Sequence, residues 1–126
     1  MSHSEMKATY NSYPDRYVFK VESMDESSGK FSGIFQEHSC NVELVTGWFN
    51  FNDAAKCTDL KFSSNTDSWS LKARYESGER YFEEWSAIRT SKSGSIDTEN
   101  IKFYMDMSDH GTSWFGDTDW WGKGHM

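Results

Sequence analysis

Residues 68–75 read Ser-Trp-Ser-Leu-Lys-Ala-Arg-Tyr, with an apolar residue at every second position. Successive side chains of a β-strand point to opposite faces of a sheet, so Trp69, Leu71, Ala73 and Tyr75 share one face. The serine, lysine and arginine side chains between them share the other face. The stretch therefore predicts a strand with one face in a core and the other in water.

The same period of two recurs along most of the chain, and turn residues such as those of 24–29 and 76–79 separate the apolar runs. The one helix-like feature is a turn near Ala54 and Ala55. The predicted strands are 17–21, 30–36, 42–51, 60–62, 68–75, 80–89 and 100–107. About eight strands at a spacing of about ten residues predict an all-β antiparallel barrel or sandwich.

Composition supports one folded domain spanning residues 1–126, with 21 aromatic residues among them. A net charge of −7 without a basic stripe is unfavourable for binding nucleic acid or an anionic membrane surface, so we expect neither partner. No run of 18 apolar residues is present. The first residues lack a signal-peptide pattern, which leaves the location open between a secreted mature form and the cytoplasm.

The sequence shows no catalytic or metal-binding motif. Its four histidines (His3, His38, His110 and His125) lie in no nucleophile or zinc signature, and no phosphate-binding loop occurs. We therefore expect no enzyme, no metal site and no cofactor.

Two features leave alternatives open. Cys40 and Cys57 flank one predicted strand and fit either a disulfide or two reduced thiols. The segment 108–126 carries three tryptophans between Trp114 and Trp121 among glycine and aspartate. It fits a last strand with a frayed end whose rings cap the barrel, or an exposed aromatic surface for a ligand or a neighbouring subunit.

The order of several segments resembles the avidin/streptavidin family. They are Ala-Thr-Tyr-Asn at 8–11, an apolar strand at 16–21, Gly-Lys-Phe-Ser-Gly-Ile-Phe at 29–35, Glu-Leu-Val-Thr-Gly-Trp-Phe at 43–49, and the strand 68–73. The resemblance implies a single up-and-down eight-stranded β-barrel over about 8–115. Residues 1–6 and 116–126 would then be flexible or part of a subunit interface.

The resemblance also implies a ligand site, with departures from the family's pattern. Asn11 matches the asparagine that binds the carbonyl group of biotin, and Trp114 lies near the tryptophan that reaches a neighbouring subunit's pocket. Asp15 and Glu37 stand where the family has hydroxyl residues, and Phe35 replaces a tyrosine, so hydroxyl donors are lost. A carboxylate at Asp15 would repel the ureido oxygen of biotin.

We therefore expect a small organic ligand held by aromatic residues at the barrel mouth, and the resemblance implies biotin or a related small molecule as that ligand. The expected ligand-binding residues are Tyr10, Asn11, Asp15, Phe35, Glu37, Trp69, Tyr75, Trp85, Tyr104 and Trp114.

Two other functions remain open. The first is a carbohydrate-binding lectin that uses the Trp/Asp-rich tail, including Trp120 and Trp121. The second is an acidic interaction or inhibitor module that occupies a basic site on a partner protein. The density of aromatic residues and the resemblance both favour a homodimer or homotetramer.

Overall fold

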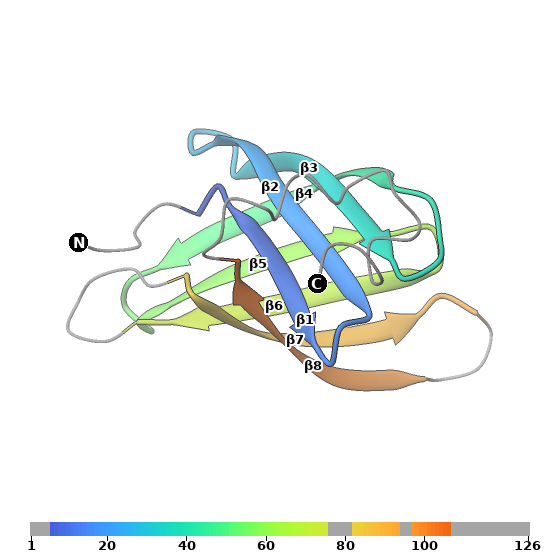
Figure 1. Ribbon diagram of the computed structural model, residues 1–126. Helices are drawn as coiled ribbons and strands as arrows, with labels where there is room; N and C mark the ends of the chain where they lie inside the picture. Colours follow the sequence, from blue (N-terminus) through green and yellow to red (C-terminus); the bar gives the residue numbers. More distant parts are fainter. Residues whose placement is uncertain (1–5, 76–81, 94–96, 107–126) are drawn as a thin grey trace.

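The computed structural model describes residues 6–75, 82–93 and 97–106. Eight antiparallel strands close into one barrel in which each strand pairs with the next, and β8 pairs with β1 (Figure 1). The strands are β1 (Thr9–Tyr13), β2 (Tyr17–Asp25), β3 (Lys30–Glu37), β4 (Glu43–Asn52), β5 (Cys57–Ser63), β6 (Asp67–Arg74), β7 (Glu84–Ser91) and β8 (Thr98–Met105). The predicted all-β, up-and-down eight-stranded barrel is confirmed.

The strand bounds differ most from the sequence pattern at three strands. β2 continues beyond residue 21 to Asp25, and β5 begins at Cys57 rather than at residue 60. β7 begins at Glu84, and residues 80 and 81 of the predicted strand lie outside the described residues. Pairing with long neighbours extends β2 and β5 through polar residues that carry little periodicity of their own. No helix that could span a membrane occurs in the described parts of the chain.

Aromatic rings fill the interior of the barrel. Phe19 lies near the middle, with ring centroids of Tyr10 and Phe103 each 4.9 Å from its own and that of Phe62 at 5.5 Å. Trp69, on the face predicted for the core, stacks on Phe62 at 6.1 Å. Burial of this much apolar area at about 25 cal/mol per Å² is the main stabilising contribution to such a domain.

Two glycines allow backbones to approach closely inside the wall. A Cβ on Gly33 would lie 1.9 Å from the carbonyl oxygen of Lys20 on β2, and one on Gly47 would lie 2.0 Å from that of Lys61 on β5. Neither position can carry a side chain without moving a strand.

The two ends of the barrel differ in chemistry. The apolar end, where β2–β3, β4–β5 and β6–β7 are joined, is closed by Met6 and Phe82 packed near Tyr10 and Trp85. Met6 is therefore inside the core, whereas residues 1–6 are expected from the sequence to be flexible or part of a subunit interface; residues 1–5 lie outside the described residues. The polar end, where the other four connections lie, is closed by charged side chains.

The two cysteines are free thiols on opposite ends of this barrel. Cys40 lies in the β3–β4 connection at the polar end, and Cys57 begins β5 at the apolar end. The ten residues of β4 separate the two ends, so a disulfide between them would require a different fold.

Candidate functional site

At the polar end, the last inward-facing positions of the strands carry polar side chains. On β6, the inward series Ala73, Leu71, Trp69 ends in Asp67, and on β8 the series that contains Ile101 ends in Glu99. Each strand contributes one such residue, either from the strand itself or from the position that follows it. We name the set the polar ring; it consists of Ser12, Tyr17, Glu37, Glu43, Ser64, Asp67, Arg89 and Glu99.

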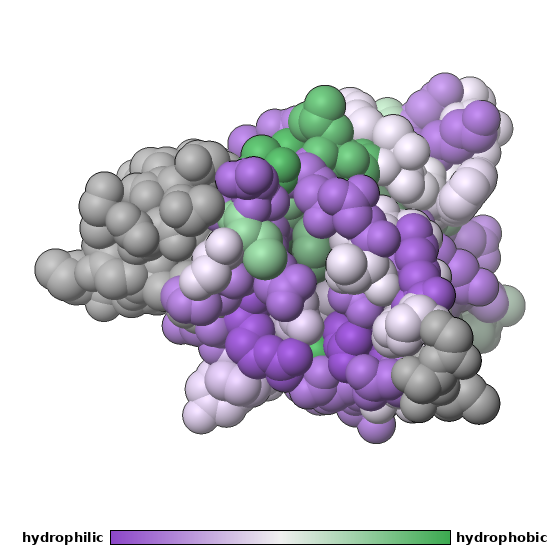
Figure 2. Space-filling model, turned by 90° about the vertical axis from the view of Figure 1, so that its right-hand side faces the viewer, coloured by the Kyte–Doolittle hydropathy of each residue, from purple (hydrophilic) through white to green (hydrophobic). Residues whose placement is uncertain are grey.

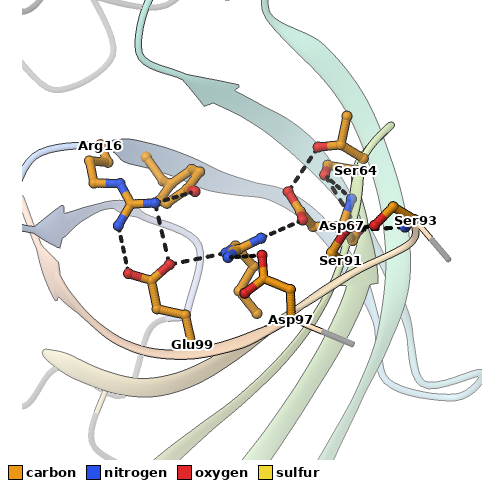
Figure 3. A network of polar contacts seen from close by, with 10 residues as sticks. Arg16, Ser64, Asp67, Ser91, Ser93, Asp97 and Glu99 are labelled. Carbon is orange, nitrogen blue, oxygen red and sulfur yellow. Dashed lines mark hydrogen bonds and ion pairs between the residues drawn. The ribbon is translucent and has the colours of Figure 1, made fainter. Parts of the chain in front are cut away.

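Arg89 is the centre of the polar ring. Its guanidinium donates to Asp67 at 2.7 Å, to Asp97 at 3.2 Å and to Glu99 at 3.2 Å. Figure 3 labels these three acidic residues. Its side chain is 12% exposed and that of Asp67 is 7% exposed. Burial alone would lower the pKa of Arg89, but the hydrogen bonds to Asp67 and Asp97 outweigh it and raise that pKa. Arg89 is therefore permanently charged and held from three sides.

Arg16 extends the network from the β1–β2 connection. It donates to Glu99 at 2.7 Å and to the Tyr17 hydroxyl at 2.9 Å. Figure 3 shows Arg16 and Glu99 facing each other. These side chains are more open than the Arg89–Asp67 pair, with Arg16 44% and Glu99 35% exposed. The hydrogen bond from Arg16 lowers the pKa of Glu99 below its ordinary value. The outer part of the network is thus an accessible ion pair.

The β1–β2 connection that carries Arg16 is organised by one hydroxyl. Ser12 Oγ accepts hydrogen bonds from the backbone amides of Arg16 at 3.0 Å and Tyr17 at 2.9 Å, and donates to the Pro14 carbonyl at 2.7 Å. These three bonds fix where β2 begins and so position both Arg16 and Tyr17 at the rim.

Aromatic rings form a floor beneath the polar ring. The Tyr17 ring lies 4.9 Å from Trp69 and 5.9 Å from Phe35, and Phe35 lies 5.6 Å from Trp69. Burial raises the pKa of the Tyr17 hydroxyl. Trp69 Nε1 is buried and has no hydrogen-bond partner among the described residues. A buried donor without an acceptor costs about 1–3 kcal/mol, so the floor holds one unmet hydrogen bond.

The polar end as a whole is acidic. Asp15, Glu37, Glu43, Asp67, Asp97 and Glu99 provide six carboxylates, and Arg16, Arg89 and Lys92 provide three cations. Burial, followed by the nearby charge of Asp67, raises the pKa of Glu37. Figure 2 views this end of the barrel and shows mostly hydrophilic residues, with hydrophobic residues gathered along its upper edge.

Three of the sequence-predicted site residues meet at the polar end. Phe35 and Trp69 are in the floor, and Glu37 is in the polar ring. Asp15 is exposed in the β1–β2 connection next to Arg16. This part of the expected site is assembled by the fold.

Three others lie in the barrel towards the apolar end. Tyr10 donates a hydrogen bond to the Met6 carbonyl at 2.7 Å, and Trp85 packs edge-on against Tyr10. The hydroxyl groups of Tyr75 and Thr58 lie 3.0 Å apart. These residues belong to the packed core.

Asn11 and Tyr104 are corrections to the expected site. They are cross-strand partners on the outer wall, where Asn11 Nδ2 donates to Asp106 at 3.1 Å and Tyr104 is 43% exposed. Tyr10 and Phe103 take the inward positions, and alternation sends their neighbours outward. Trp114 and the rest of the tail lie outside the described residues.

Sequence reasoning missed Arg16, Asp67, Arg89 and Glu99. A usable signal was present for three of them, because Asp67, Arg89 and Glu99 share the parity of the apolar residues on their own strands. A charged residue at the end of an inward series marks a barrel mouth. Arg16 lies in a connection, where parity gives no information.

Comparisons with known proteins identify no family for this chain. No family model matches the chain, and neither a curated protein nor a solved structure matches it. In the described part of the chain, no three His, Cys, Asp or Glu side chains are grouped so that they could hold a metal ion. The site must therefore be interpreted from its own geometry.

Proposed function

We propose that the protein is a small-ligand-binding barrel whose ligand enters at the polar end. The observation that carries this is the polar ring above an aromatic floor of Tyr17, Phe35 and Trp69. A few placed polar groups over apolar rings are typical of small-molecule sites. The unmet Trp69 Nε1 donor adds a group that a ligand oxygen or nitrogen would satisfy.

The ligand class follows from charge. Six carboxylates face three cations at this end, so a cationic or hydrogen-bond-donating head fits better than an anionic one. Aromatic faces also attract cations, by about 0.5–2 kcal/mol per contact. A ring or other flat apolar part would lie against the floor. We therefore infer a small, ring-bearing amine or a similar donor.

Entry requires one part of the network to move. The Arg16–Glu99 pair is the part to open, because both side chains are partly exposed and Arg16 lies in a connection. The Arg89–Asp67 pair is nearly buried and spans two paired strands, so it stays in place. A ligand head would take over the Glu99 and Glu37 carboxylates as Arg16 swings out.

The resemblance to avidin remains part of this proposal, and the specific ligand that the resemblance implies is biotin. Phe35 and Glu37 lie together at the polar end, which supports a mouth at the same end of the barrel. Asn11 on the outer wall and the carboxylates of Asp15 and Glu37 oppose a tight ureido site. We accordingly expect an amine to bind better than biotin.

The test uses three probes and a matched pair of variants. Tryptamine, biotin and methyl glucoside are titrated while the melting temperature and tryptophan fluorescence are followed. Glu37→Gln removes a carboxylate from the polar ring, and Glu84→Gln removes one from the outer wall, where Glu84 pairs with Lys102. A ligand at 100 times its dissociation constant stabilises the fold by about 2.7 kcal/mol.

Tryptamine should raise the melting temperature of the wild type and of Glu84→Gln, with at least tenfold weaker binding to Glu37→Gln. An equal loss of tryptamine affinity in both variants, or no shift of the melting temperature with any probe, would contradict the proposed site. Tight binding of biotin alone would support the avidin resemblance and overturn the amine assignment.

A further inference from the structure

Trp48 stands out on the outer wall of the barrel. Its neighbours Gly47 and Phe49 face inward, so the indole points outward, and it is 59% exposed. The other two tryptophans that the structure describes, Trp69 and Trp85, are buried. An indole offers a large rigid apolar surface with one donor, and its exposure on a strand suits contact with a ligand.

Three shallow hollows meet at Trp48. Their volumes are about 410, 440 and 310 Å³, and each has Trp48 in its lining. The first extends over β3 towards Met24, the second over β5 and β6 towards Lys72, and the third over β6 and β7 towards Ile88. Together they form a continuous surface across several strands with the indole at its centre.

A row of hydroxyl groups crosses the same wall. Ser32 pairs with Thr46, Ser63 with Ser68, and Ser68 with Thr90. Gly47 pairs with Phe62, so Thr46 and Ser63 are the next positions of β4 and β5. Neighbouring strands lie about 4.8 Å apart, which places one hydroxyl per strand from β3 to β7. Each hydroxyl can donate and accept a hydrogen bond.

Two lysines flank the indole in the next row. Trp48 pairs with Lys30 on β3 and with Lys61 on β5, and the two lysines are two strand spacings, about 10 Å, apart. No ion pair joins either of them to another described residue, whereas Lys72 pairs with Asp59 at 3.2 Å. The linings of the three hollows hold Lys30, Lys61 and Lys72 against Asp25, the cross-strand partner of Lys30, and Asp59. In a chain of net charge −7, this small excess of positive charge favours an anionic partner.

We propose that this wall, from β3 to β7, binds an acidic polysaccharide. One pyranose ring would stack on Trp48, acidic groups of the adjoining sugars would meet Lys30 and Lys61, and sugar hydroxyls would bond to the hydroxyl row. This site is separate from the polar end, which is acidic and faces the barrel axis.

Two other occupants fit less well. A second copy of the chain would bury lysines and serines, which are depleted from the cores of subunit interfaces. A nucleic acid would require a longer basic stripe than two free lysines beside one ring. Both become outcomes of the test.

The experiment titrates an oligogalacturonate, and a neutral cello-oligosaccharide of equal length, by calorimetry and tryptophan fluorescence. Trp48→Ala and Lys61→Gln change the proposed site, and Tyr104→Ala is the matched control because it removes another exposed outer-wall ring. Ser68→Asp provides a second variant that places a carboxylate in the hydroxyl row.

The wild type and Tyr104→Ala should bind the oligogalacturonate equally and prefer it to the neutral sugar. Trp48→Ala should bind at least tenfold more weakly, and Lys61→Gln and Ser68→Asp several-fold more weakly, with less salt dependence for Lys61→Gln. No binding, equal binding of the neutral sugar, or unchanged affinity in Trp48→Ala would overturn the proposal. So would tighter binding of single-stranded nucleic acid, or a wild-type dimer that Trp48→Ala dissociates.

Discussion

The two ends of the barrel are closed by opposite means. At the apolar end, Met6 and Phe82 pack with Tyr10 and Trp85 around the interior. At the polar end, Arg89 and Arg16 are held by carboxylates above an aromatic floor. The rings of a core are closely packed, so none of them can move without opening an empty cavity. Each side chain of a half-exposed ion pair can exchange the other for water or a ligand. The comparison identifies the polar end as the one that can open.

The largest expected effect comes from removing a ring at the apolar end. Trp85→Ala deletes a fully buried side chain that stacks on Phe82 at 5.9 Å and meets Tyr10 edge-on at 5.9 Å. We expect a loss of about 3–5 kcal/mol in the free energy of unfolding, measured by urea denaturation. A loss below about 1 kcal/mol would mean that this end is not tightly packed.

Removal of the central guanidinium should cost less, because water can reach part of the polar end. Arg89→Met leaves Asp67 nearly buried without its 2.7 Å partner, and we expect a loss of about 3 kcal/mol. Adding Asp67→Asn should recover part of that loss in a double-mutant cycle. Additive losses in the double variant would show that the two side chains are not energetically coupled.

Two carboxylates of the polar end should respond to pH with opposite sign. The folded state raises the pKa of Glu37 by burial, so its ionised form opposes folding above that pKa. Glu37→Gln should therefore raise the melting temperature at neutral pH. The size of this stability change should be smaller than the losses expected for Trp85→Ala and Arg89→Met. The gain should shrink as the pH falls below the ordinary glutamate value of 4.5, where the wild type is protonated in both states.

Glu99→Gln provides the mirror control. Arg16 lowers the pKa of Glu99, so its ionised form stabilises the fold above the ordinary value, and this contribution is lost as the pH falls through the lowered pKa. The variant should melt below the wild type at neutral pH and match it in strong acid. If the melting temperatures of Glu37→Gln and Glu99→Gln, relative to the wild type, change with pH in the same direction, the proposed charge network is contradicted.

The smallest expected effect is on the two thiols, one at each end. Cys40 is exposed at the polar end and Cys57 is 3% exposed at the apolar end. Iodoacetamide should modify Cys40 in the native protein and Cys57 only after denaturation, as read by peptide mass spectrometry. Burial and neighbouring carboxylates raise the pKa of Cys40, so its reaction should be slow at neutral pH. Native modification of Cys57 would show that the apolar end opens.

Alternating residues were enough to predict the wall of this barrel, and in part its interior. The series from Trp69 to Tyr75 lies in the core as expected, because burial on one face forces the period of two. Asn11 and Tyr104 were misplaced because the family motif, rather than strand parity, assigned them to the pocket. Parity alone would have sent both outward, as the structure has them.

The charged network was not predictable in the same way. Arg16 and Glu99 are 83 positions apart, and only closure of β8 onto β1 brings the β1–β2 connection near Glu99. Local sequence carries no information on such a pair. The lysines beside Trp48 depend likewise on the register between β3, β4 and β5.

The central claim is that a ligand enters at the polar end, and intermolecular nuclear Overhauser effects in the tryptamine complex test it most directly. We predict contacts from the tryptamine ring to the side chains of Tyr17 and Trp69, together with a shift of the Arg16 guanidinium resonance. Contacts to Phe82 and Trp85 at the apolar end, or to Trp48 on the outer wall, would contradict the claim.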